Sequence, residues 1–562
     1  MQPTDRRAVF KPKIFESLRN YSGAAFQADI GAGITVGIVA LPLCLALGIA
    51  SGVRPVQGIY TAVIAGVIVG LMGGSRVQIA GPTAAFVPIV YGIVVAHGVQ
   101  NLYLCTMMAG VLLVIMGLSR MGSLIKFIPY PVTSGFTTGI AVMIIFGQVE
   151  DSLGLTTTGD RPAHFVPKVQ FLAEFISTLN PWAVGITIAC IAIIWFWPRL
   201  GLKRIPGPIV AVIVSAIATK LLNLPVETIA TRFAEGVPQG LPGFALPAIT
   251  WEAVSEMMIP ATAIAMLAAI ESLLSAVVAD GLTNDRHRSN TELIAQGAAN
   301  IVSPLFMGIP VTGAIARTAS NIDSGARSPV SSIVHSVTLA LVLLVLAPYA
   351  GSIPMAAMAA VLIMVARRMG EWRELVHVSR LPGSDALVLV ATFSLTIVFD
   401  LTVAVLIGML LAGFLFTKRL SETTEISKVT AADELENLEQ LVHGKQVPEG
   451  AVVFRIFGPF FFGAAEKMED ALEGAGKLPR VLILRMNLVP AMDATALNAL
   501  ETVLERLVAA GGTLVISGAH RQPLAMMMRA GFVEKLGRAN IRANFDEALV
   551  RAREILGVTP TR

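Results

Sequence analysis

Two stretches, Ile79-Ala80-Gly81-Pro82-Thr83-Ala84-Ala85 and Val311-Thr312-Gly313-Ala314-Ile315-Ala316-Arg317-Thr318, interrupt long apolar runs of this chain. Glycine and proline break helices, because glycine exposes the backbone and proline lacks an N–H donor. In hydrocarbon such a break is tolerated only where it lines a cavity inside the protein. A helix that restarts after the break points unpaired N–H groups and its positive dipole end into that cavity. The two stretches therefore predict a binding site for an anion.

The composition is that of a polytopic membrane protein. The 562 residues are 54% hydrophobic and only 14% charged, and the mean hydropathy is +0.72. A membrane span needs about 20 apolar residues, and hydropathy alone predicts roughly ten to twelve spans. Runs without Asp, Glu, Lys or Arg include 30–51, 77–119, 181–198, 328–366 and 386–399. No phosphate-binding loop, dinucleotide fingerprint or nucleophile elbow is found, which argues against an ATP-driven pump and against an enzyme.

Charge and cysteine placement indicate the orientation and the chemistry of the interior. Segment 1–28 carries a cluster of basic residues before the first span, and the positive-inside rule makes it cytoplasmic. These residues are Arg6, Arg7, Lys11, Lys13 and Arg19. The three cysteines, Cys44, Cys105 and Cys190, lie far apart in apolar segments and are expected to be buried small side chains. The histidines show no zinc-type spacing, so no metal site is predicted.

A change of composition near Lys418-Arg419 predicts a domain boundary. We expect a transport domain over 29–419, an acidic linker over 420–447 and a soluble domain over 448–562. Apolar segments alternate with amphipathic ones in the last part, which predicts a small α/β domain. The expected strands are 452–457, 481–484 and 513–517, the last of them ending at Gly518, and the expected helices are 464–472, 494–508, 523–529 and 545–556.

The membrane part shows a weak internal repeat. Pro42 precedes Gly81 by 39 residues, and Glu271 precedes Gly313 by 42 residues. This near-match suggests an inverted repeat, with one half over about 29–222 and the other over about 254–419. The polar stretch 222–253 would separate the halves.

Glu271 is the strongest single signal, because the segment 260–279 is otherwise apolar. A carboxylate within the membrane is costly unless it faces a cavity, a partner or a proton. Burial disfavours its charged form, which suits a proton carrier. Ser275, at i+4, shares its helical face. Glu271 is accordingly a candidate for ion coupling, and the alternative is a structural carboxylate bound to Arg317.

The residues after the two breaks are the candidate substrate site: Thr83, Ala84, Ala85, Gly313, Ala314 and Arg317. Thr83 can donate its hydroxyl to an oxyanion. Arg317 lies within one turn of the second break, where its guanidinium would add a full charge to the dipole end. Alternatively, Arg317 neutralises Glu271 or anchors a loop.

Together these residues resemble the SulP family of sulfate permeases and related anion transporters. The resemblance covers nearly the whole chain and rests on Asp29-Ile30-Gly31-Ala32-Gly33-Ile34-Thr35-Val36-Gly37, Leu41-Pro42, Gly58-Ile59-Tyr60, Gly74-Ser75-Arg76, Gly81-Pro82-Thr83, Arg317-Thr318, Asn321 and Gly325. It implies an all-α membrane domain of fourteen segments in two inverted seven-span repeats. It further implies a core moving against a gate like an elevator, a homodimer, and a cytoplasmic C-terminal α/β STAS domain.

The segment around Glu271-Ser272-Leu273-Leu274-Ser275 is similar to the sodium-dependent bicarbonate branch of the family. That branch associates sodium with an Asp and a Thr in the eighth segment and with Gly-Ala-Thr in the tenth, where this chain has Gly313-Ala314-Ile315 and lacks one hydroxyl. Proton coupling through Glu271 is therefore preferred over sodium. In the STAS-like domain, Ala494 stands at the usual phosphoacceptor position, which argues against a phosphoswitch and favours assembly or binding of a cytoplasmic partner.

The sequence thus predicts a secondary active transporter of bicarbonate, sulfate or a similar oxyanion in the plasma membrane, with both termini cytoplasmic. It needs no cofactor beyond a coupling proton or sodium, and nucleic acid is not expected as a partner. The alternatives are a sodium-coupled bicarbonate symporter, a C4-dicarboxylate symporter and an anion exchanger. A STAS-linked membrane sensor or scaffold is the alternative without transport, and a nucleobase permease is disfavoured by Arg317.

Overall fold

The computed structural model describes residues 10–123, 129–158, 162, 165–200, 206–233, 240–399, 401–428, 447–461, 467–468 and 478–558. The chain divides into two compact units, Met1–Leu410 and Leu411–Arg562, and each has its own core. Most of the predicted linker 420–447 lies outside the described residues.

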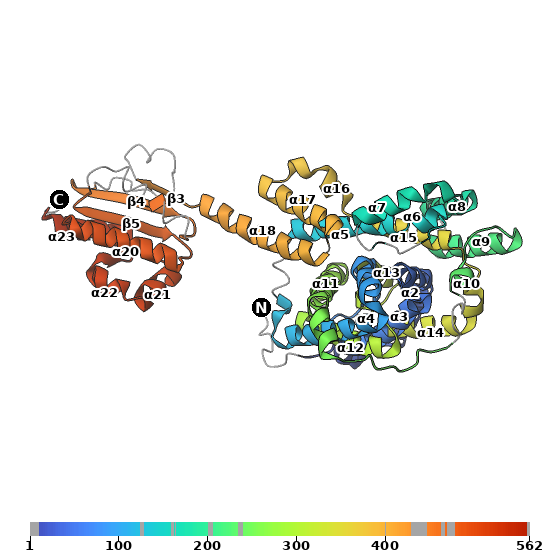
Figure 1. The fold of residues 1–562 in the computed structure, drawn as a ribbon. Helices are drawn as coiled ribbons and strands as arrows, with labels where there is room; N and C mark the ends of the chain where they lie inside the picture. Colours follow the sequence, from blue (N-terminus) through green and yellow to red (C-terminus); the bar gives the residue numbers. More distant parts are fainter. Residues whose placement is uncertain are drawn as a thin grey trace. The chain divides into compact units, whose positions relative to one another are not determined.

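In the first unit, one set of helices packs around two short strands and is called the first helix group (Figure 1). It comprises α2 (Gly23–Ala50), α3 (Pro55–Met72), α4 (Val87–Leu118), α11 (Trp251–Thr283), α12 (Ser289–Val302), α13 (Ile315–Asp323) and α14 (Val330–Ala350). Small residues let these helices approach closely, as is usual in membranes. Gly110 on α4 faces Gly297 on α12, and a Cβ on either would lie 2.7 Å from the carbonyl oxygen of the other.

The remaining helices of this unit form the second helix group, with α5, α8, α15 and α17 packed on one another. Its members are α5 (Tyr130–Gly147), α6 (Val149–Leu153), α7 (Phe165–Glu174), α8 (Pro181–Phe196), α9 (Gly207–Leu221), α15 (Met355–Met369), α16 (Trp372–Val376) and α17 (Gly383–Val398). The short α10 (Ile229–Arg232) connects towards α11, and α18 (Leu401–Glu422) leads into the second unit. The two groups meet where α15 contacts α2 and where the turn Ala84–Phe86 contacts α5 and α15.

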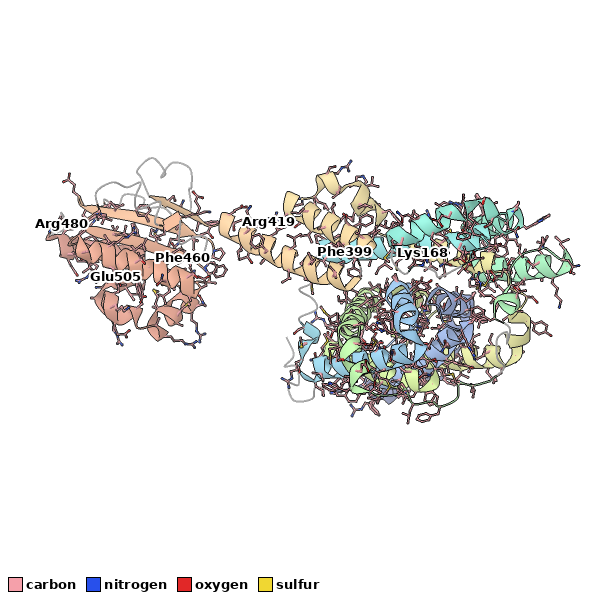
Figure 2. The ribbon with its side chains drawn as sticks, viewed as in Figure 1. Lys168, Phe399, Arg419, Phe460, Arg480 and Glu505 are labelled. Atoms are coloured by element: carbon pink, nitrogen blue, oxygen red, sulfur yellow. The ribbon has the colours of Figure 1, made fainter. Side chains whose placement is uncertain are left out.

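Six of the described helices are long and apolar enough to cross a membrane, and three shorter ones are also apolar. The six are 23–50, 55–72, 84–118, 130–153, 181–199 and 251–283. The predicted membrane-spanning helical domain is thereby confirmed. Figure 2 shows the ribbon with its side chains, where Lys168 marks α7 and Phe399 follows the end of α17.

The second unit is the predicted α/β domain. Its strands are β3 (Glu425–Lys428), β4 (Ala451–Phe457), β5 (Val481–Leu488), β6 (Thr513–Ser517) and β7 (Ile541–Arg542), in that order in one sheet. β3 is antiparallel to β4, and the other pairs are parallel. The expectation that the last strand is 513–517 was wrong, because β7 has only two residues and carries no recognisable pattern. The predicted helix 464–472 lies outside the described residues except at 467–468.

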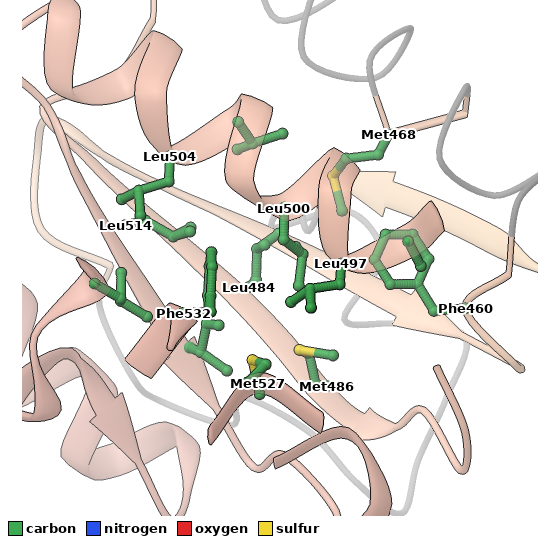
Figure 3. Packing of buried hydrophobic residues seen from close by; sticks show 14 of the residues in the cluster. Phe460, Met468, Leu484, Met486, Leu497, Leu500, Leu504, Leu514, Met527 and Phe532 are labelled. Atoms are coloured by element: carbon green, nitrogen blue, oxygen red, sulfur yellow. The ribbon is translucent and has the colours of Figure 1, made fainter. Parts of the chain in front are cut away.

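Helices cover both faces of this sheet. α20 (Ala494–Ala509), α21 (Arg521–Arg529) and α22 (Phe532–Leu536) contribute to one apolar core, and α23 (Phe545–Leu556) to the other. Successive side chains of a strand point to opposite faces. Accordingly, Leu482 and Leu484 of β5 join the first core, whereas Val481 and Ile483 join the second. Figure 3 shows the first core, in which Leu500 of α20 lies beside Leu484.

Candidate functional site

The two interrupted stretches lie side by side in the first helix group. β1 (Ala80–Gly81) and β2 (Thr312–Gly313) form an antiparallel pair in which Ala80 lies opposite Gly313. The N–H of Ala314 extends the pairing by donating to the Ile79 carbonyl at 2.8 Å. The breaks thus satisfy each other's backbone groups, as the interior of a membrane protein requires.

A helical turn restarts immediately after each strand. The 3-10 turn Ala84–Phe86 follows Thr83 and runs on into α4, and α13 follows Ala314. Neither Thr83 nor Ala314 caps its helix with a side chain. The first N–H groups of a helix have no partner within it, so both starts keep donors for a ligand. Ala84 and Ala314 are nearly buried and Ala85 is fully buried, so both starts lie in the interior of the first helix group.

Glu271 lies against the first break. Its Oε2 accepts a hydrogen bond from the Thr83 hydroxyl at 3.0 Å, and both side chains are half-buried. In the described part of the chain no ion pair within 4.0 Å joins Glu271 to Arg317. The alternative of a carboxylate bound directly to Arg317 is therefore not what the structure shows. The carboxylate of the second half instead contacts a hydroxyl of the first half.

Arg317 reaches the same break from the other side and is 4% exposed. Its Nη2 donates to the Pro82 carbonyl, its Nη1 lies 3.9 Å from the Cys44 sulfur, and its buried Nε has no hydrogen-bond partner. A Cβ on Gly81 would lie 2.7 Å from Nη1, so the close approach of the guanidinium depends on glycine there. Arg317 thus anchors the first break and places a buried cation beside it.

Ser275 lies on the side of α11 that faces α13. Its hydroxyl donates to Thr318 Oγ1 at 3.1 Å, and the same oxygen accepts the N–H of Ile79 at 3.1 Å. The Thr318 hydroxyl therefore joins α11, α13 and the residue that precedes β1, and Thr318 is fully buried. Among the described residues, no cluster of three or more His, Cys, Asp or Glu side chains forms a metal centre.

Several residues that support the site were not predicted. Ser272 lies 2.7 Å from the Thr312 hydroxyl, oxygen to oxygen, and accepts the N–H of Gly313 at 3.0 Å. The Gln78 amide donates to the Ser272 carbonyl at 3.2 Å. The serines at 272 and 275 stand three residues apart on α11, and that spacing of small polar residues could have indicated a polar helix face.

Three comparisons with known proteins agree. The sulfate permease family matches residues 26–392, and the STAS domain matches residues 444–548. A putative sulfate transporter of Bacillus subtilis, YvdB, is 40% identical over 531 residues, which are 94% of this chain and 98% of that protein. The bicarbonate transporter BicA of Picosynechococcus is 30% identical over 548 residues and 95% of each chain.

Among solved structures, murine Solute Carrier 26 family member A9, an anion transporter in the inward-facing state, superposes with a TM-score of 0.85. The match covers 97% of this chain and 94% of that chain. The sequence identity is 16%, so this likeness shows the fold alone.

Proposed function

The chain belongs to the sulfate permease family, and on that premise we propose that it carries a small oxyanion such as sulfate or bicarbonate across the membrane by secondary active transport. The observation that carries the proposal is the meeting of two uncapped helix starts, at Thr83 and Ala314, beside a buried arginine. Helix N-termini and a guanidinium both favour a negatively charged ligand. The names of the relatives YvdB and BicA support the same substrate class.

In this proposal the coupling ion is a proton carried by Glu271. Its carboxylate lies beside the restarted helix through its hydrogen bond to Thr83. An anion bound there and an ionised Glu271 repel each other, so the anion binds best when Glu271 is protonated. Proton and anion then load together, which is symport. Ser275 is the alternative sodium ligand with Glu271, although its hydroxyl already donates to Thr318.

Alternating access would come from movement of the first helix group against the second. Glu271 and Arg317 lie on α11 and α13 of the first group, and Thr83 and Ala314 lie at the helix starts that follow its two strands, so the four would move as one body. The turn Ala84–Phe86 contacts α5 and α15 of the second group, which would form the wall along which the site moves. This arrangement supports an elevator mechanism.

The coupling is tested with purified protein in liposomes. Uptake of labelled sulfate, bicarbonate, chloride and fumarate is measured while proton and sodium gradients are imposed separately. We expect an inward proton gradient to drive accumulation of sulfate or bicarbonate, and Glu271→Gln to make uptake independent of that gradient. Uptake that ignores the proton gradient and rises with sodium would instead establish the sodium-coupled symporter. A requirement for an internal anion would establish exchange, and a preference for fumarate would establish a dicarboxylate carrier.

A second variant separates transport from signalling. Arg317→Ala removes the buried cation and the hydrogen bond to Pro82, so we expect uptake to be lost while expression in the membrane is retained. The control is Arg538→Ala in the C-terminal domain, whose side chain is 85% exposed and whose loss leaves uptake unchanged. Normal uptake by Arg317→Ala would contradict the proposed site. A sensor or scaffold would be favoured if the unsubstituted chain took up none of the four anions under any gradient.

A further inference from the structure

A short helical stretch precedes the first membrane helix. α1 (Lys13–Ser17) continues directly into a 3-10 turn, Leu18–Asn20, and α2 begins at Gly23. The stretch has two different faces. Lys13 and Ile14 are buried, whereas Phe15, Leu18 and Arg19 are exposed. Residues at i, i+3 and i+4 lie on one side of a helix, so the three exposed side chains form one face.

The buried face is fixed to the ends of the first helix group. Lys13 Nζ lies 3.0 Å from both carboxylate oxygens of Asp285, and its backbone N–H donates to the Gly73 carbonyl at 2.9 Å. Arg288 donates to the Glu16 carboxylate at 2.9 Å. These contacts reach the residues that follow α3 and those that join α11 to α12. The stretch therefore cannot roll over, and its exposed face points away from the protein.

The exposed face carries large apolar side chains. Phe15 is 74% exposed and Leu18 is 46% exposed, and Phe26 on the first turn of α2 is 48% exposed. α2 has 28 residues, about 42 Å of helix, against a hydrocarbon core of about 30 Å. The helix is therefore long enough for its first turn to reach the level of the headgroups. Phe26 thus adds a further exposed apolar side chain, on the helix that follows residues 15–18 in the chain.

We infer that residues 10–20 form an interfacial anchor that lies in the headgroup layer and binds anionic lipid. Aromatic side chains prefer this layer, and Lys or Arg beside them adds attraction to anionic headgroups. Glu16 is the acidic residue among residues 10–20, and its carboxylate forms an ion pair with Arg288. In the described part of the chain, no ion pair within 4.0 Å involves Lys11 or Arg19. The stretch thus offers free positive charge next to Phe15 and Leu18.

The test uses the full chain in nanodiscs of phosphatidylcholine and phosphatidylglycerol. Phe15→Cys is spin-labelled, and its accessibility to oxygen, which concentrates in lipid, is compared with that to a water-soluble nickel chelate. The three native cysteines are buried, so the label goes to the introduced thiol. Two sites of similar exposure serve as references: Ile188→Cys on the membrane helix α8 and Val508→Cys on α20, each 62% exposed in the native chain.

We expect the label at position 15 to be reached by oxygen in preference to nickel, as at position 188 and unlike position 508. Replacing phosphatidylglycerol with phosphatidylcholine, or introducing Arg19→Gln, is expected to shift the accessibility at position 15 towards nickel. A label at position 15 that is reached mainly by nickel in both lipids would overturn the inference. A label that neither oxygen nor nickel reaches would also overturn it, because the C-terminal domain or a second copy would then cover the face. No effect of the lipid charge would overturn the role of anionic lipid. Leu18→Cys provides the same test if Phe15→Cys does not fold.

Discussion

Gly313 shows how tightly the paired breaks are packed. A Cβ at this position would lie 1.8 Å from Nε2 of Gln78 and 3.2 Å from the Cα of Ser272. Both neighbours hold β2 in place, because Gln78 donates to the Ser272 carbonyl and Ser272 accepts the N–H of Gly313. A single methyl group would therefore have to displace the hydrogen bonds that bring the two halves together.

We expect Gly313→Ala to destabilise the first unit by about 1–3 kcal/mol, the usual cost of overpacking, and to abolish anion uptake. The measurement is the fraction of monodisperse protein that survives heating in detergent, together with uptake in liposomes. Gly92→Ala on α4 is the control, since nothing lies within 4 Å of its Cβ. Alanine also forms helix better than glycine by about 1 kcal/mol, so this control should be neutral or stabilising. Equal losses in the two variants would contradict the packing seen at Gly313.

Single residues also show what the sequence could and could not predict. Glu271 can be recognised because it is a lone carboxylate in an apolar run. Its partner Thr83 could not be predicted, because the two are 188 residues apart and the sequence does not fix how α11 is rotated. Asp29 is a second buried carboxylate, accepting from the Tyr21 hydroxyl and the Arg327 N–H at 2.6 Å each. Its structural role could not be predicted, because its partners Tyr21 and Arg327 lie outside the apolar run that it begins.

At the scale of elements, the positions of the two breaks follow from glycine and proline, but their pairing does not. A two-residue strand has no periodicity, so β1, β2 and β7 leave no signal in the sequence. The pairing of Ala80 with Gly313 arises because the helices on either side bring the breaks together. Helix interiors and the long strands β4, β5 and β6 carry their own apolar pattern, and these were predicted.

The contact of α1 with the first helix group depends on the charge of Asp285. Burial acts to raise the pKa of Asp285, but the backbone N–H of Arg286, the Lys13 ammonium and the Arg76 guanidinium outweigh burial and hold it below its ordinary value. Because the pKa is lower in the folded state, the stabilisation is present above the unfolded-state pKa and is lost as the pH falls through the folded-state pKa. The contact should therefore persist at neutral pH and fail only in acid.

We expect Asp285→Asn to release α1 at neutral pH, since the neutral amide cannot match the charges of Lys13 and Arg76. A spin label on Phe15→Cys would become mobile in this background, whereas without the substitution it would become mobile only when the pH falls through the lowered pKa of Asp285. Asp323→Asn at the end of α13 removes an exposed acid and is the control. A label that stays equally immobile in both backgrounds would show that backbone contacts such as that from Lys13 to Gly73 suffice.

At the scale of the whole molecule, the two units have separate cores and should unfold separately. The C-terminal core around Leu500 contains no residue of the membrane unit. Leu500→Ala removes a fully buried side chain, and such a change costs about 2–5 kcal/mol. Calorimetry of the full chain in detergent should show two transitions, of which Leu500→Ala lowers only the one that belongs to the C-terminal unit. Val508→Ala on the same helix, 62% exposed, should leave both in place. A shift of both transitions by Leu500→Ala would mean that the two units stabilise each other. In that case, sulfate uptake by Leu500→Ala, measured at a temperature between the two transitions, would also fall.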